Sequence, residues 1–201
     1  MGNTNAPFGF KPFNDVKRAQ FYAVQTAPTI NVFVGDLVAA GNKGLVTAKL
    51  GLVNVIEDAN IIPATPGDAT PLLGSVLACF DEDMDPISYI AAARVGDSTV
   101  AGYILVADHP DQLFYAQVQA ALSAADLDLN YEIYSPALSA GNTSTGLSKQ
   151  EIIVAGANTT NTIPIRIYGQ YGLEDDTTAA YSRVICGINS ECHYYGAGSA
   201  I

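Results

Sequence analysis

The sequence contains few charged residues. Asp, Glu, Lys and Arg together make up 14% of its 201 residues, whereas about a quarter is usual for a soluble domain. A monomer normally covers its surface with such side chains, so their scarcity favours an oligomer that hides part of its surface. The hydrophobic share of 49% is large enough to form a folded core.

Basic residues are especially scarce. The chain has nine Lys and Arg residues and twenty Asp and Glu residues, which gives a formal net charge of -11. Such a surface repels nucleic-acid phosphates and anionic lipids, and no basic patch interleaved with aromatic residues is present. We therefore expect neither nucleic acid nor a membrane as a partner.

Cysteine and histidine are too few for a recognisable metal or disulfide pattern. The three cysteines are Cys79, Cys186 and Cys192, and their spacing forms neither a disulfide framework nor a CxxC zinc site. Cys186, Cys192 and His193 offer three soft ligands, but the sequence shows no fourth. We interpret the cysteines as buried free thiols and expect no metal and no cofactor.

Several functional motifs are absent. The chain has no Gly-x-Ser-x-Gly elbow and no Gly-x-x-x-x-Gly-Lys phosphate loop. Apolar runs are interrupted within about a dozen residues, too short for a membrane-spanning helix, and the beginning of the sequence does not resemble a signal peptide. We expect no catalysis; a small hydrolase that uses carboxylates at Asp81, Asp83 and Asp85 is the weakest of the alternatives.

The pattern that is present is that of short β-strands separated by turns. Strand-like segments recur with turn residues every eight to twelve positions, and only 123–126 suggests a helical turn. The sequence therefore predicts an all-β barrel or sandwich of roughly ten short strands, with an extended arm over 1–17 and one β domain over 18–201. The expected strands are 20–24, 30–34, 37–40, 45–46, 52–56, 72–80, 87–94, 100–107, 113–118, 128–134, 151–155, 163–171 and 182–190.

The central segment 99–119 is the most informative. Two apolar runs, 100–107 and 113–118, flank the polar turn 108–112, which predicts a β-hairpin or a strand corner. Asp108 beside His109 is also compatible with a general acid or base. We favour an Asx-type turn with an exposed imidazole, because neighbours on a turn usually point apart.

The first seventeen residues combine Pro and Gly with three phenylalanines. This composition excludes a regular helix, yet it contains too many aromatic rings for a solvated tail. The pattern predicts an arm whose rings dock in pockets, either on its own domain or on a neighbouring subunit. The residues expected to make these contacts are Phe8, Phe10, Pro12 and Phe13.

The acidic segment 81–86 resembles the start of a calcium-binding loop. Asp81, Asp83 and Asp85 occupy the first alternating positions, but Pro86 stands where glycine is needed and Ala92 where glutamate is needed. The segment is more typical of a solvated acidic loop.

Several separated stretches form a recognisable series. They are the start Asn5–Pro12, the Gly-Asp strand entry at 34–38, the central stretch 103–117, Asn130, the loop 141–148 and the C-terminal Asn189-x-x-x-His193. In this order they resemble a family of small structural proteins from tailed-bacteriophage heads. The turn and strand signature consists of Asp108, Pro110, Asp111, Phe114, Gln117, Asn189 and His193. The chain departs from the pattern at His109, which replaces a second acid, and at Asp128, where glycine is expected.

The resemblance implies a β-rich decoration or cement protein on the outside of a virion capsid. Such proteins are often trimeric, so the implied partners are the major capsid protein and further copies of the chain. A carbohydrate-binding or host-attachment β module, with Tyr194 and Tyr195 as stacking residues, is the alternative, and another minor virion role also remains open.

Overall fold

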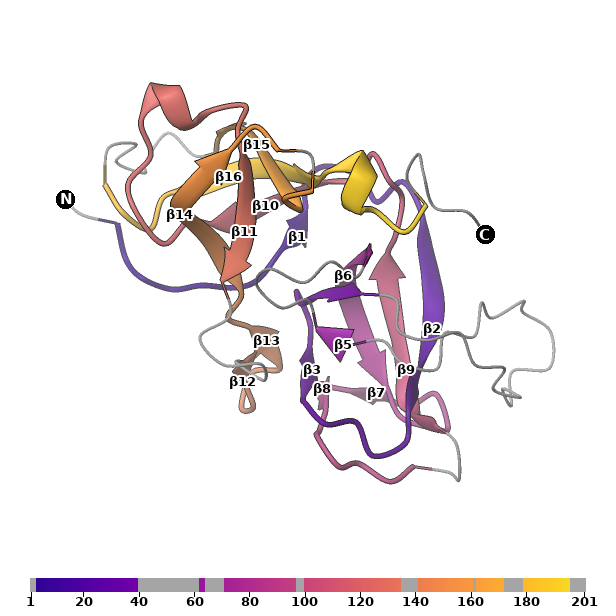
Figure 1. The fold of residues 1–201 in the computed structure, drawn as a ribbon. Coiled ribbons are helices and arrows are strands. Elements are labelled where there is room, and N and C mark those ends of the chain that lie inside the picture. The colour runs from indigo at the N-terminus through magenta and orange to yellow at the C-terminus, as the bar shows by residue number, and fades with distance from the viewer. Residues whose placement is uncertain are drawn as a thin grey trace.

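The computed structural model describes residues 3–39, 62–63, 71–96, 100–134, 141–160, 162–171 and 179–195. The chain is all-β, as the sequence predicts, and two six-stranded antiparallel sheets form separate lobes (Figure 1). Within these ranges, no helix is long and apolar enough to cross a membrane. The strands expected at 45–46 and 52–56 and the acidic loop 174–176 lie outside the described residues.

Sheet A forms the first lobe, in the upper left of Figure 1. Its strands, in spatial order, are β1 (Lys11–Pro12), β10 (Leu113–Gln117), β16 (Arg183–Ile188), β15 (Ile165–Gln170), β11 (Asn130–Tyr134) and β14 (Glu151–Asn158). An isolated parallel bridge joins Val118 to Ile152, and the Gln119 N–H donates to the Ile152 carbonyl at 2.9 Å. The extension of β10 therefore meets β14, and the sheet curls toward a barrel.

Sheet B forms the second lobe. Its strands are β2 (Ala19–Gln25), β9 (Val100–Ala107), β6 (Leu72–Phe80), β4 (Leu37–Ala39) and β5 (Ile62–Pro63), with β7 (Pro86–Ile87) also paired to β6. Two small ribbons accompany the sheets: β3 (Val32–Phe33) with β8 (Tyr89–Ile90), and β12 (Gly141–Asn142) with β13 (Leu147–Ser148). The short 3₁₀ turns are η1 (Ala124–Asp126) and η2 (Ser190–Cys192).

Two hydrophobic clusters account for these strands. The first fills sheet A with alternate residues such as Phe114, Ile167 and Val184, and it also receives Leu37 and Leu72 from sheet B. The second lies on one face of sheet B. It contains Tyr22, Val24, Val32, Val38, Leu73, Val76, Cys79, Ile90, Ala101, Ile104 and Val106. Because the first cluster draws residues from both sheets, the lobes pack against each other along a shared apolar boundary.

The central segment is a strand corner rather than a hairpin. Strand β9 pairs with β2 and β6 in sheet B, whereas β10 pairs with β1 and β16 in sheet A. The turn closes where the Gln112 N–H donates to the His109 carbonyl at 2.9 Å. Residues 108–112 therefore carry the chain from one lobe to the other.

The prediction at 87–94 is wrong in its extent. The segment forms only the end of β7 and the short β8, and the chain then turns at Ala92 and Ala93. Ala93 has a φ of 58°, which is incompatible with an extended strand. The helical turn expected at 123–126 is confirmed, with the Ser123 amide and hydroxyl both donating to Asp126 Oδ2 at 2.7 Å.

Candidate interaction surface

The N-terminal arm lies on its own chain. Phe10 is fully buried in the core of sheet A, and its N–H donates to the Gly35 carbonyl at 2.8 Å. Strand β1 follows and pairs with β10. Phe10 therefore has no surface left for a partner, and burial of such a ring contributes about 1.5–3 kcal/mol to folding.

Two glycines allow the arm to approach this closely. Gly9 has a φ of +75°, and a Cβ added there would lie 2.3 Å from the Gly35 carbonyl oxygen and 2.6 Å from Ser148 Cβ. Gly35 itself has a φ of +92°. Only glycine adopts this conformation without strain and leaves space for the neighbouring backbone. The stretches 5–12, 34–38 and 141–148, which carry the resemblance, thus meet in three dimensions.

Gln117 fastens the beginning of the arm. Its side-chain oxygen accepts the Ala6 N–H at 3.1 Å, and its amide nitrogen donates to Asn5 Oδ1 at 3.1 Å and to Glu151 Oε2 at 3.0 Å. Gln112 fastens the other end, where its Oε1 accepts the Lys17 N–H at 2.9 Å. Both glutamines are buried, so they act as internal connectors.

The prediction that Asp108 forms an Asx-type turn is wrong. Its side chain is fully buried, with Oδ1 2.8 Å from Arg18 Nε and Oδ2 accepting the Tyr22 hydroxyl at 2.6 Å. Arg18 also donates to the Asp108 carbonyl at 2.9 Å. The carboxylate is therefore held by Arg18, which directly precedes β2, and by Tyr22 of β2. His109 is bonded within the turn, where its Nδ1 accepts the Asp111 N–H at 3.1 Å.

Two residues of the C-terminal segment join the group formed by Asp108, Arg18 and Tyr22. Tyr195 lies 3.1 Å from the Tyr22 hydroxyl, oxygen to oxygen, and the Arg18 guanidinium lies 4.5 Å from the Tyr195 ring centre. His193 Nδ1 accepts the Tyr195 N–H at 3.1 Å. We call Arg18, Tyr22, Asp108, His193 and Tyr195 the crossover cluster, because they surround the point where the chain passes between sheets.

Burial controls the ionisation of the crossover cluster. It lowers the pKa of His193 to about 4, with Arg18 lowering it further and Asp108 opposing the change. Burial and the hydrogen bond to Asp108 raise the pKa of Tyr22. At neutral pH the imidazole and the phenol are therefore both uncharged.

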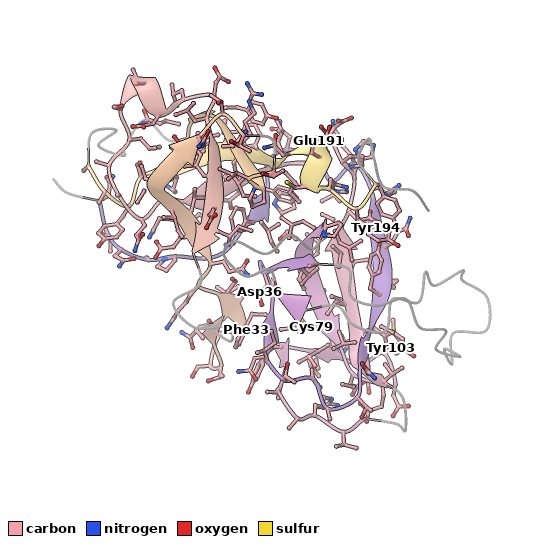
Figure 2. The ribbon with its side chains drawn as sticks, viewed as in Figure 1. Phe33, Asp36, Cys79, Tyr103, Glu191 and Tyr194 are labelled. Atoms are coloured by element: carbon pink, nitrogen blue, oxygen red, sulfur yellow. The ribbon has the colours of Figure 1, made fainter. Side chains whose placement is uncertain are left out.

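Asp36 is a second buried carboxyl, next to the labelled Phe33 and Cys79 in Figure 2. Its Oδ2 accepts the Phe33 N–H at 2.8 Å. Burial raises the pKa of Asp36 to about 7, although hydrogen bonds from Ser148 and Phe33 lower it. Burial likewise raises the pKa of the Cys79 thiol to about 12.

The acidic segment and the cysteines show no arrangement typical of a metal site. Asp81 Oδ1 accepts the N–H groups of Asp83 at 3.0 Å and Asp85 at 2.9 Å, so this side chain closes its own turn. The three cysteines are free. Across the part of the chain that the structure describes, no group of three or more His, Cys, Asp and Glu side chains is placed to hold a metal ion.

The outer face of sheet A carries a continuous row of aromatic rings. Its order is Phe8, Tyr115, Tyr171 and Phe13, with ring centres 5.3, 5.3 and 5.6 Å apart. Tyr115 points outward because its neighbours in β10, Phe114 and Ala116, point into the core. These four residues are called the aromatic row below.

The aromatic row remains accessible. Tyr171 is 37% exposed, and the other three rings are half-buried. Lys11 Nζ lies 5.1 Å from the Phe8 ring centre, and Pro12 is half-buried in β1 beside it. Three of the four predicted contact residues, Phe8, Pro12 and Phe13, therefore remain available at the surface, whereas Phe10 does not.

The turn and strand signature divides between two environments. Asp108, Phe114, Gln117 and His193 are buried and connect parts of the chain. Pro110, Asp111 and Asn189 lie at the surface around one cavity of sheet A. Most of the signature thus maintains the fold, and only its surface members are placed to meet a ligand.

Sequence reasoning missed several residues of these sites. Arg18 and Tyr22 carried no local signal, since their partner is 86 to 90 positions away. Tyr115 and Tyr171 lay within segments read only as strands. Gly187, in the middle of an apolar strand, is the sequence signal that could have indicated a close approach at this point.

Comparison with protein-family models, with curated proteins and with solved structures finds no match.

Proposed function

We propose that this chain is a capsid decoration protein of a tailed bacteriophage, which binds the outside of the assembled head and stabilises it without catalysis. The observation that carries the proposal is the aromatic row. Its rings are displayed on a rigid sheet, and buried aromatic residues contribute most to the affinity of protein interfaces. The bacteriophage resemblance of the sequence supplies the identity of the partner, the major capsid protein.

The physical basis of the stabilisation is mass action. A protein that binds the assembled shell and not its free subunits shifts the equilibrium toward the shell. Several weak contacts made at once, across a lattice or within a trimer, bind more tightly than one, because each bound contact raises the local concentration for the next. The low charge content of the chain fits a surface that is partly covered in such an assembly.

The experiment is a co-sedimentation assay with expanded, undecorated capsids of the bacteriophage whose genome encodes the chain. The wild-type protein should saturate the capsids. The double variant Phe13→Ser/Tyr171→Ser should bind about tenfold or more weakly, because two apolar anchors are lost. The matched control is Val95→Ser, which changes a side chain that is 74% exposed and precedes β9 in the other lobe.

Two results would contradict the proposal: no binding of the wild-type protein to expanded capsids, or equal binding of the wild type and the double variant. Light scattering after gel filtration tests the assembly state. A mass near three times 21.0 kDa supports a trimer on a local threefold axis, and a monomer restricts the proposal to a subunit that assembles on the shell.

A further inference from the structure

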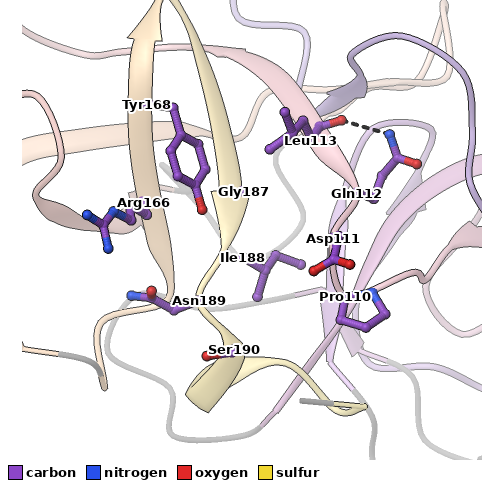
Figure 3. A pocket seen from close by; sticks show the side chains of 10 residues that line it. All are labelled: Pro110, Asp111, Gln112, Leu113, Arg166, Tyr168, Gly187, Ile188, Asn189 and Ser190. Carbon is purple, nitrogen blue, oxygen red and sulfur yellow. Dashed lines mark hydrogen bonds between the residues drawn. The ribbon is translucent and has the colours of Figure 1, made fainter. Parts of the chain in front are cut away.

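A polar cavity of about 340 Å³ opens on the outer face of sheet A, beside the strand corner (Figure 3). Strands β15 and β16 form one side, and the beginning of β10 forms the other. This volume is at the lower end of the range for small-molecule sites, about 300–1,000 Å³. The lining residues that matter are Asp111, Gln112, Arg166, Tyr168, Gly187 and Asn189.

Two irregularities of the sheet create the cavity. The pairing of β15 with β16 shifts register between Ile167 and Gly169, so Tyr168 is the extra residue of a β-bulge. Gly187, inside β16, lies beneath the redirected ring: an added Cβ would lie 3.1 Å from Tyr168 Cε2 and 3.4 Å from Leu113 Cδ2. A bulge redirects a side chain, and a strand-interior glycine allows a neighbouring group to approach closely, so together they set the Tyr168 ring as a wall of the cavity.

The Tyr168 ring, which forms one wall of the cavity, is open to solvent. Tyr168 is 49% exposed, a large share for an aromatic side chain. Its ring presents C–H and π surface, and its hydroxyl both donates and accepts hydrogen bonds.

The polar groups around this ring are of both signs. Asp111 is exposed and supplies carboxylate acceptors, whereas Arg166 supplies a guanidinium donor. The Asn189 amide nitrogen donates to the Ile163 carbonyl at 2.6 Å, which orients its side-chain oxygen. Both ends of the Gln112 side chain are hydrogen-bonded, because Oε1 accepts the Lys17 N–H and Nε2 donates to the Leu113 carbonyl. This side chain is therefore held in place as part of the cavity wall.

We propose that this cavity binds a saccharide. A sugar ring has an apolar C–H face that packs on an aromatic ring, and hydroxyl groups that pair with planar carboxylate, amide and guanidinium groups. The cavity provides this combination around Tyr168. Asp111 disfavours a phosphate ligand by charge repulsion, and the polar lining disfavours a purely apolar one.

The proposal does not depend on capsid binding, because the cavity and the aromatic row are formed by different residues. It also differs from the sequence-based alternative, which placed sugar stacking on Tyr194 and Tyr195. Tyr195 bonds Tyr22 and lies under Arg18, and both tyrosines pack against the core of sheet B. The accessible stacking ring is Tyr168.

The test is saturation-transfer NMR with the full chain and a panel of glucose, galactose, mannose, rhamnose and N-acetylglucosamine. At least one sugar should receive saturation from the wild-type protein. The affinity for it should fall about tenfold or more in Tyr168→Ala, which removes the ring wall, and in Gly187→Val, whose side chain would displace that ring. Val95→Ser is the control, since it changes a side chain that is 74% exposed and lies outside both the cavity and the aromatic row.

The proposal is overturned if no sugar of the panel binds, or if binding survives in both cavity variants. Circular dichroism of each variant confirms that the fold is retained, and Gly187→Val keeps the test decisive if Tyr168→Ala is unfolded. Capsid co-sedimentation of Gly187→Val separates the two proposals: lost sugar binding with normal capsid occupancy assigns the cavity to the saccharide alone.

Discussion

The crossover cluster and the outer face of sheet A use similar side chains in opposite ways. In the crossover cluster, Asp108 is fully buried and bonded to Arg18 and Tyr22. On the outer face of sheet A, Tyr171 of the aromatic row and Tyr168 of the cavity are 37% and 49% exposed. The first group uses its binding capacity within the chain, whereas the second leaves it available to a partner.

The difference also bears on the residues that carry the sequence resemblance. Gly9, Gly35, Asp108 and Gln117 all join segments of one chain that are distant in sequence. These residues therefore maintain the fold. The residues that we propose to contact a partner lie in the aromatic row and around the cavity.

The largest contrast is expected between two aspartates of the same turn. Asp108→Ala should lower the free energy of unfolding by about 3 kcal/mol, because it leaves Arg18 and Tyr22 without their buried acceptor. Asp111→Ala should change it by less than about 0.5 kcal/mol, because that side chain is exposed. Urea denaturation of both variants measures the difference, and equal effects would contradict the assignment of Asp108 to the interior.

A smaller effect is expected in the pH dependence of stability. The folded pKa of His193, about 4, is below its unfolded value near 6.5, so acidification from about pH 6.5 to 4 should destabilise the protein through this residue. The folded pKa of Asp36, about 7, is above its unfolded value near 3.8, so a rise from about pH 4 to 7 should destabilise it through that residue.

In the wild type the two contributions oppose each other between about pH 4 and 6.5, so that the net change in stability is small. His193→Gln should reveal the Asp36 contribution, so that stability falls as the pH rises. Asp36→Asn should reveal the His193 contribution, so that stability falls as the pH decreases. Denaturation at several pH values measures both slopes, and slopes of the same sign in the two variants would refute this account.

The smallest contrast compares two tyrosine hydroxyls. Tyr22→Phe removes a hydrogen bond to a buried carboxylate and should cost about 1.5 kcal/mol of stability. Tyr168→Phe removes a half-exposed hydroxyl and should change stability by less than about 0.5 kcal/mol. Thermal denaturation of the pair provides the measurement; a larger loss in Tyr168→Phe would mean that Tyr168 belongs to the structural core.

The sequence by itself determined the all-β class and the positions of most long strands. The predicted strand at 163–171 contains β15, and the predicted strands at 72–80 and 100–107 coincide with β6 and β9. These features depend on local patterns of apolar and turn residues, which a single strand expresses without its neighbours.

Only the tertiary structure decided which strands pair and which polar residues are buried. Strands β9 and β10 follow each other in sequence but belong to different sheets. Asp108 accepts a hydrogen bond from Arg18, which is ninety positions away. The pocket for Phe10 and the opening beside Gly187 arise in the same way. Each depends on contacts between distant segments, and such contacts are fixed by the packing of the whole core rather than by local sequence.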